Sequence, residues 1–206
     1  MPGRSIPPEI RDSLLRDARG SALVEFAITL PLLVVFVVGI YDFSGAFNQK
    51  QKIAQAAQEG AIVAGAQPMT DIAVGPSGPM ANPDSLLPVA TAVFNSLAGS
   101  GVLPNANQGT CVPPTTASTH VGLTWTYKIS GCASVAGDLL ITINRGWVCA
   151  SGPACTTVPP FSVGTVVGVQ YPYHWQFNTV VQLIAPGANY AATTQLMEHA
   201  TVHNQL

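Results

Sequence analysis

An apolar run over residues 20–41 constrains the fold of this chain more than any other feature. Glu25 is the only charged residue within the run. At about 1.5 Å per residue the run reaches roughly 33 Å as a helix, which is enough to cross a bilayer core of about 30 Å. We therefore expect a transmembrane span at about residues 22–41. A carboxylate near the edge of such a span costs on the order of a few kcal/mol unless it reaches water or a partner, so Glu25 calls for an explanation.

The basic residues that flank the run predict its orientation. The segment before it holds Arg4, Arg11, Arg16 and Arg19, whereas only Lys50 and Lys52 follow it closely. The more basic flank of a span stays in the cytoplasm, so we expect residues 1–20 to be a cytoplasmic leader and the C-terminal part to lie outside. The run is too long for an ordinary cleaved secretory signal and lacks an Ala-x-Ala site. No later window is long and apolar enough to span, so the chain is expected to cross once.

Residues 21–67 are predicted to form one long helix that continues past the membrane. Pro31 falls within the span and is expected to bend the helix mildly, because it removes one backbone hydrogen bond. Beyond the membrane, small residues recur at every fourth position, namely Ala56, Gly60 and Ala64. This spacing lets another helix or a sheet approach closely. Docking on the chain's own domain and packing against a neighbouring subunit both stay open.

Residues 68–119 are predicted to form an irregular connection, because proline and glycine are frequent there. A short helix is expected within it, near residues 84–98. Its apolar face would contain Leu86, Ala90, Val93, Phe94 and Leu97, and Gly99 would end it.

Residues 120–206 predict a β-rich domain. Apolar and polar residues alternate over residues 121–129 and, most clearly, over residues 167–177. A period of two is typical of a half-buried strand. Pro172 should divide the second run into two strands or form a bulge. For residues 190–202 a strand is favoured over a helix. The elements together predict an α+β fold in which a long N-terminal membrane helix packs on a C-terminal antiparallel β-sheet.

All the cysteines follow the span, in the part expected outside the cytoplasm. They are Cys111, Cys132, Cys149 and Cys155. An even number of exported cysteines predicts two disulfides, for which the sequence allows three pairings. We favour Cys149–Cys155 together with Cys111–Cys132, whose longer loop would stabilise the fold by roughly 3 kcal/mol. The rival is a zinc site, but the spacing contains no Cys-x-x-Cys pair.

The scarcity of charge argues against several classes of function. Charged residues make up 9% of the chain, against about 25% in ordinary soluble domains, and the net charge is −2. No electric field would steer this chain to nucleic acid. We expect no metal, cofactor or catalytic site, because His199 and His203 lack a third ligand and no nucleophile elbow or phosphate loop is present.

Four short motifs link the N-terminal part of the chain to a known family. They are Val24-Glu25-Phe26-Ala27, Leu30-Pro31-Leu32-Leu33, Gly39-Ile40-Tyr41-Asp42-Phe43 and Ala56-Ala57-Gln58-Glu59-Gly60-Ala61-Ile62. In this order and spacing they resemble the N-terminus of the TadE-like proteins, minor pseudopilins of bacterial tight-adherence (Flp) pili. The resemblance covers residues 16–66. Gln58 and Ile62 stand where the family pattern has arginines, so a role of those arginines does not carry over.

The resemblance implies a pilin-like α+β fold and cleavage by a prepilin peptidase between Gly20 and Ser21. Glycine before the cut suits this chemistry, because the backbone must enter a narrow active site. Cleavage would leave an α-amine on Ser21, one helical turn from Glu25. The resemblance implies that Glu25, next to Phe26 in the same motif, then pairs with the N-terminal amine of a neighbouring subunit. Such a pair would offset the cost of the carboxylate and fix the register between helices.

The resemblance also implies partners and a location. The partners would be the prepilin peptidase, other pilins and pseudopilins of the same system, and the inner-membrane assembly platform. The protein would be a single-pass protein of the bacterial inner membrane, with its C-terminal domain periplasmic, extracellular or within the pilus. Its function would be pilus assembly by association, without catalysis. An alternative stays open: an uncleaved membrane anchor that carries a periplasmic binding or scaffold domain, in which Glu25 reaches the membrane surface.

Overall fold

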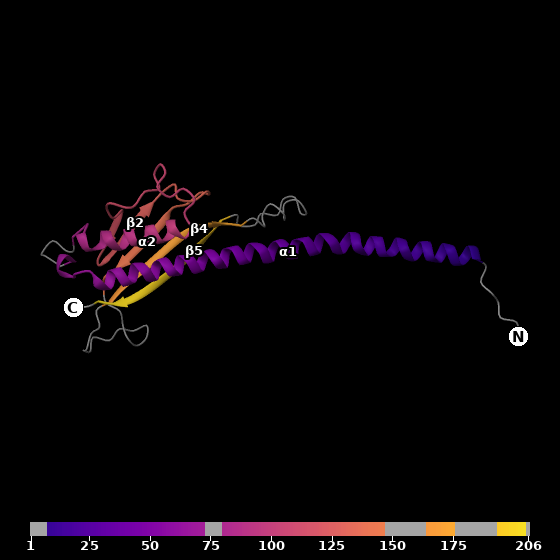
Figure 1. Ribbon diagram of the computed structural model, residues 1–206, viewed down its shortest axis with the longest axis horizontal. Helices are drawn as coiled ribbons and strands as arrows, with labels where there is room; N and C mark the ends of the chain where they lie inside the picture. Colours follow the sequence, from indigo (N-terminus) through magenta and orange to yellow (C-terminus); the bar gives the residue numbers. More distant parts are fainter. Residues whose placement is uncertain (1–7, 73–79, 147–163, 176–192, 205–206) are drawn as a thin grey trace. The chain divides into compact units, whose positions relative to one another are not determined.

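The computed structural model describes residues 8–72, 80–146, 164–175 and 193–204. It contains a long helix, α1 (Pro8–Ala66), a shorter helix, α2 (Leu87–Gly99), and two 3-10 turns, η1 (Thr70–Ile72) and η2 (Asp84–Leu86). The strands are β1 (Thr119–Val121), β2 (Thr124–Ile129), β3 (Leu139–Asn144), β4 (Gly164–His174) and β5 (Thr193–His203). The predicted fold class is confirmed: a long N-terminal helix and a C-terminal antiparallel sheet (Figure 1).

The chain divides into two compact units whose boundary lies within α1, between Ser44 and Gly45. In the first unit the described residues are 8–44, all of them in α1. The second unit holds the rest of α1, α2 and the whole sheet, and we call it the folded unit.

Helix α1 begins at Pro8 rather than at the expected Ser21. Proline suits the first position of a helix, since its fixed φ is already helical and the missing N–H has no partner there. The residues after it include leucine, alanine, arginine and glutamate, which favour helix. The helix then runs through Pro31 without interruption and ends at Ala66.

The five strands form one antiparallel sheet in the order β1-β2-β3-β4-β5, so each strand pairs with its neighbour in sequence. The alternating segment 121–129, expected as one strand, is a hairpin. Val121 pairs with Thr124 across a two-residue turn, and Gly122 has a φ of +57° there. Glycine adopts a positive φ at the first position of a two-residue turn at little cost, which explains why the strand folds back there.

Alternation along the strands gives the sheet one apolar face. The buried core side chains with an aliphatic or aromatic group on β2, β3 and β4 are Trp125, Tyr127, Ile129, Leu139, Ile141, Ile143, Val167, Val169 and Tyr171. They form one hydrophobic cluster with the buried faces of α2 and of the C-terminal part of α1. On α2 that face contains Val89, Ala90, Val93, Phe94 and Leu97. Burial of this apolar area is the main term that stabilises the folded unit.

The expectation that Pro172 breaks or bulges its strand is wrong. Strand β4 continues through Pro172, which pairs with Gln195 of β5. The pairing of β3 with β4 ends at Gln170, so β4 has only one neighbouring strand at Pro172. A proline without an N–H is tolerated at such a place, because one side of the strand has no ladder to complete.

Candidate functional site

The N-terminal part of α1 presents its apolar side chains outward. No residue from Gly20 to Tyr41 is buried, and Leu23 is 71% exposed. Within the described residues, one helix is long and apolar enough to cross a membrane, judged by length and composition, and it starts at Gly20. A continuous exposed apolar surface of this length is consistent with membrane anchoring.

Glu25 stands on this apolar surface with its carboxylate available to a partner. The side chain is exposed, and the hydroxyl of Thr29 donates a 2.6 Å hydrogen bond to the main-chain oxygen of Glu25 rather than to its carboxylate. Phe26 beside it is exposed as well. At Gly20 an added Cβ would meet no other atom within 4 Å, and Ser21 is exposed. The space beside Gly20 is therefore free, and helix α1 continues through this junction.

Residues 20–61 match the family model described as TadE-like protein. This segment of the chain is TadE-like. The match confirms the resemblance, begins at Gly20 and includes Glu25 and Phe26. It indicates a function associated with tight-adherence pili. No curated protein and no solved structure matches the chain.

The C-terminal part of α1 packs against α2 and the sheet within the folded unit. Ala56 and Ala64 are fully buried, and Gly60 lies between them on the same face of α1. A Cβ at Gly60 would lie 2.3 Å from Cγ2 of Val93 on α2 and 3.2 Å from Cγ1 of Val167 on β4. Glycine is required here because α1, α2 and β4 meet at that point. Of the two explanations left open for these small residues, the structure gives docking within the same chain.

Two lysines of the same part of α1 form polar contacts with neighbouring elements. Nζ of Lys50 forms a 3.0 Å ion pair with Oε1 of Glu198 on β5. Nζ of Lys52 donates a 2.9 Å hydrogen bond to the main-chain oxygen of Ser100, just after α2. Both lysines that closely follow the apolar run thus contact other elements of the folded unit.

A buried arginine fixes the C-terminal end of α1. Arg145, directly after β3, has no exposed surface. Its Nη1 donates to the main-chain oxygen of Ala64 at 3.0 Å, and its Nη2 donates to those of Gln67 and Pro68 at 3.1 and 2.9 Å. The last carbonyls of a helix lack intrahelical donors and carry the negative end of the helix dipole, so a cation is stabilised there.

The sulfur of Met69 completes the surroundings of Arg145. Sδ accepts from Nη2 of Arg145 at 2.9 Å and from Nδ2 of Asn204 at 3.2 Å. No carboxylate in the described ranges forms an ion pair with this guanidinium. Burial lowers the pKa of Arg145 from its ordinary value, and the charge of Asp71 opposes that shift.

Arg145 was not predicted from the sequence to be a structural residue, although the sequence contains a signal for it. Alternation along residues 139–143 places the odd-numbered positions on the core face, and Arg145 continues that parity. A charged residue at a predicted core position indicates a buried partner, which here is the end of α1.

The structure contains one of the two favoured disulfides. Cys111 and Cys132 are bonded to each other, and both are fully buried. The bond joins the connection after α2 to the loop between β2 and β3. Cys149 and Cys155 lie outside the described residues, so their pairing stays a prediction.

The C-terminal histidines do not form a metal site in the parts that the structure describes. His199 and His203 lie on strand β5, four residues apart along an extended chain, and no group of three or more metal-binding side chains occurs among the described residues.

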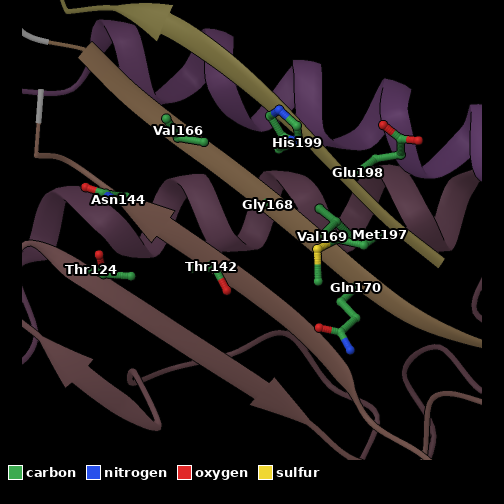
Figure 2. A pocket seen from close by; sticks show the side chains of 10 residues that line it. All are labelled: Thr124, Thr142, Asn144, Val166, Gly168, Val169, Gln170, Met197, Glu198 and His199. Carbon is green, nitrogen blue, oxygen red and sulfur yellow. The ribbon is translucent and has the colours of Figure 1, made fainter. Parts of the chain in front are cut away.

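A second candidate site is a hollow on the face of the sheet that is turned away from α1 and α2. Its volume is about 420 Å³. We call it the Gly168 groove, and it is lined by Thr124, Thr142, Asn144, Val166, Gly168, Val169, Gln170, Met197, Glu198 and His199. Figure 2 shows the groove with the helices behind the sheet and side chains from β2, β3, β4 and β5 around it. No feature of the sequence analysis pointed to it.

Proposed function

We propose that the protein is a minor pseudopilin that takes part in the assembly of a tight-adherence pilus by subunit association. In this proposal a prepilin peptidase removes residues 1–20, and the helix that begins at Ser21 packs against helices of other pilins and of the assembly platform. The protein is anchored in the bacterial inner membrane with the folded unit outside. It acts by binding, not by turnover.

One observation supports this proposal most directly: the TadE-like segment is an apolar helix that carries an exposed carboxylate. Glu25 has no hydrogen-bonded or ionic partner for its carboxylate in the described residues. In a bilayer that carboxylate needs a cation, and the α-amine created by cleavage at Ser21 is a cation at the same depth of a neighbouring helix. Gly20 carries no side chain and has free space beside it, which supports cleavage there, since the backbone must enter a narrow active site.

Substitution of Glu25 tests the proposal. Glu25→Gln removes the charge and keeps the size of the side chain, so the protein should fold and insert normally but lose pilus assembly. Glu25→Asp keeps the charge and should retain part of the assembly. The measurements are the protein level in the membrane and the amount of surface pili.

Asp84→Asn is the control, because Asp84 is an exposed carboxylate of the folded unit that lies outside the TadE-like segment. It should leave assembly intact. If Glu25→Gln assembles pili at the wild-type level, the pairing model is overturned, and the uncleaved anchor with a binding or scaffold domain becomes the better account.

A further inference from the structure

Gly168 occupies a position at which the fold itself does not need glycine. It lies in the middle of β4, between β3 and β5, and pairs with Thr142 on one side and His199 on the other. Both registers run through it without a bulge. Its backbone is outside the left-handed region, and an added Cβ would meet nothing closer than Cβ of Thr142 at 3.8 Å, which is an ordinary contact.

Two other glycines of the folded unit have an internal reason. Gly60 lets α1 approach Val93, and Gly122 forms the turn between β1 and β2. Gly168 has neither reason, and a glycine inside a strand weakens the strand because it adds no packing and loses more conformational freedom. Its visible consequence is the hollow of the Gly168 groove. Glycine at such a position is typical of a site where a ligand approaches the backbone.

The side chains around the hollow indicate the chemistry of that ligand. Within the described part of the chain, Thr142, Gln170 and His199 use none of their side-chain hydrogen-bonding groups on other residues. A hydroxyl, a carboxamide and an imidazole each offer polar groups for hydrogen bonds, as the hydroxyl groups of a sugar do. Val166 and Met197 add apolar contact beside them (Figure 2).

The groove carries little charge with which to select an ionic ligand. Glu198, which lines it, is paired with Lys50 on the opposite side of β5. Lys128 on the same face is paired with Asp138 at 3.0 Å. The volume of 420 Å³ lies in the range of roughly 300–1,000 Å³ that is usual for small-molecule sites.

From these observations we propose that the Gly168 groove binds a neutral, hydroxyl-rich ligand, namely a short stretch of uncharged polysaccharide. The ring hydroxyls bond to Thr142, Gln170 and His199, and the C–H surface of a sugar lies over Gly168 and against Val166. A protein side chain is a weaker candidate, because protein contacts select buried apolar or aromatic pockets. The inference does not rest on the role in pilus assembly, and either can fail without the other.

Binding to defined glycans tests the proposal. The full chain is purified in a polyoxyethylene detergent, since a detergent with sugar headgroups would compete. It is screened on an array of neutral oligosaccharides, and the best probe is titrated by calorimetry. Hexagalacturonate serves as the acidic probe of comparable length. We expect one or more neutral oligosaccharides to bind and hexagalacturonate to bind at least about tenfold more weakly, since the groove offers it no free cation.

Gly168→Val separates the groove from the fold. The branched side chain fits a strand and fills the hollow, so it should weaken glycan binding by about tenfold or more while the thermal midpoint is unchanged or higher. Thr126→Val is the matched control, because Thr126 pairs with Thr142 on the same face but does not line the groove. It should bind as the unmodified protein does.

Two results would overturn the inference. One is that no neutral oligosaccharide binds the unmodified protein; if Gly168→Val also abolishes pilus assembly, the groove is a contact for another subunit. The other is that Gly168→Val binds the glycan as tightly as the unmodified chain.

Discussion

The guanidinium of Arg145 and the main-chain oxygen of Ala64 are joined by a 3.0 Å hydrogen bond that ties the end of β3 to the last turn of α1. Two further carbonyls, of Gln67 and Pro68, accept from the same side chain. The bond therefore connects the sheet to the helix that also carries the TadE-like segment. The two residues that it joins are far apart in the sequence. Arg145 is the only buried cationic residue among those that the structure describes.

Replacing Arg145 should destabilise the folded unit. Arg145→Met keeps an unbranched apolar stem but leaves the carbonyls at the end of α1 without donors, which should cost about 3 kcal/mol. Thermal unfolding of the detergent-solubilised protein, followed by near-UV circular dichroism, measures the change. Lys128→Met is the control, because it removes an exposed ion pair of the same sheet, and should cost at most about 1 kcal/mol. Equal losses for the two variants would refute the assigned role of Arg145.

Two glycines should respond to the same substitution in opposite ways. Gly60→Ala places a Cβ 2.3 Å from Val93, so α1 and α2 must move apart, at a cost of about 1–3 kcal/mol. Gly168→Ala meets no close atom and should stabilise β4 by up to about 1 kcal/mol. The thermal midpoints of the two variants give both signs. A loss of stability in Gly168→Ala would mean that the fold needs this glycine.

The disulfide between Cys111 and Cys132 should contribute measurably to stability. It closes a loop with a sequence separation of 21, for which the chain-entropy estimate is about 3 kcal/mol. The double substitution Cys111→Ala, Cys132→Ala removes the bond without leaving a reactive thiol, and denaturant unfolding measures the loss. A change below about 1 kcal/mol would show that buried packing, not the bond, holds the two loops together.

The folded unit should lose stability in alkaline solution. Burial raises the pKa of Tyr127 and of Tyr171 to about 12, whereas an unfolded tyrosine titrates near pH 10. Above pH 10 the unfolded chain releases these protons and the folded chain keeps them. The stability that each tyrosine contributes is therefore complete below pH 10 and is lost as the pH rises to 12.

Between pH 10 and 12 the free energy of unfolding should fall by about 1.4 kcal/mol per pH unit for each of the two tyrosines. Unfolding measured between pH 9 and 12 gives this slope, and Tyr127→Phe should reduce it by about half. An identical slope in Tyr127→Phe would contradict the burial-driven shift.

The fold class followed from the sequence because its signals were strong and local. The apolar run gave the long helix, and alternation gave the strands of the core face. The hairpin at Gly122 and the passage of β4 through Pro172 were not predicted. The first depends on the φ of one glycine and the second on where β3 ends, and both are set by strand pairing rather than by local pattern.

The candidate functional residues also divide into those that the sequence indicated and those that it did not. Glu25 and Gly20 were apparent from the sequence, since a lone carboxylate and a glycine stand out against an apolar run and a basic leader. The Gly168 groove was not, because it is formed by side chains that four separate strands bring together. Its central residue, Gly168, falls at one of the non-core positions of the alternating segment, where the lack of a side chain is not conspicuous in the sequence.

The leader should remain uncut when the glycine before the proposed cleavage site is enlarged. A Cβ at residue 20 would meet nothing within 4 Å outside its own turn of helix, so we expect Gly20→Phe to insert normally and block only the peptidase. Ala27→Phe, also at an exposed position beyond the site, should be processed as the unmodified chain is. A Gly20→Phe protein of reduced mass would show that the peptidase does not act at this junction.

The N-terminal residue of the protein purified from its native membrane tests the central claim most directly. Intact mass and terminal sequencing identify it. The account predicts a chain that begins at Ser21, with a free α-amine one helical turn from Glu25. A chain that still carries the leader up to Gly20 would contradict processing as a pseudopilin, and would leave a membrane-anchored binding or scaffold protein.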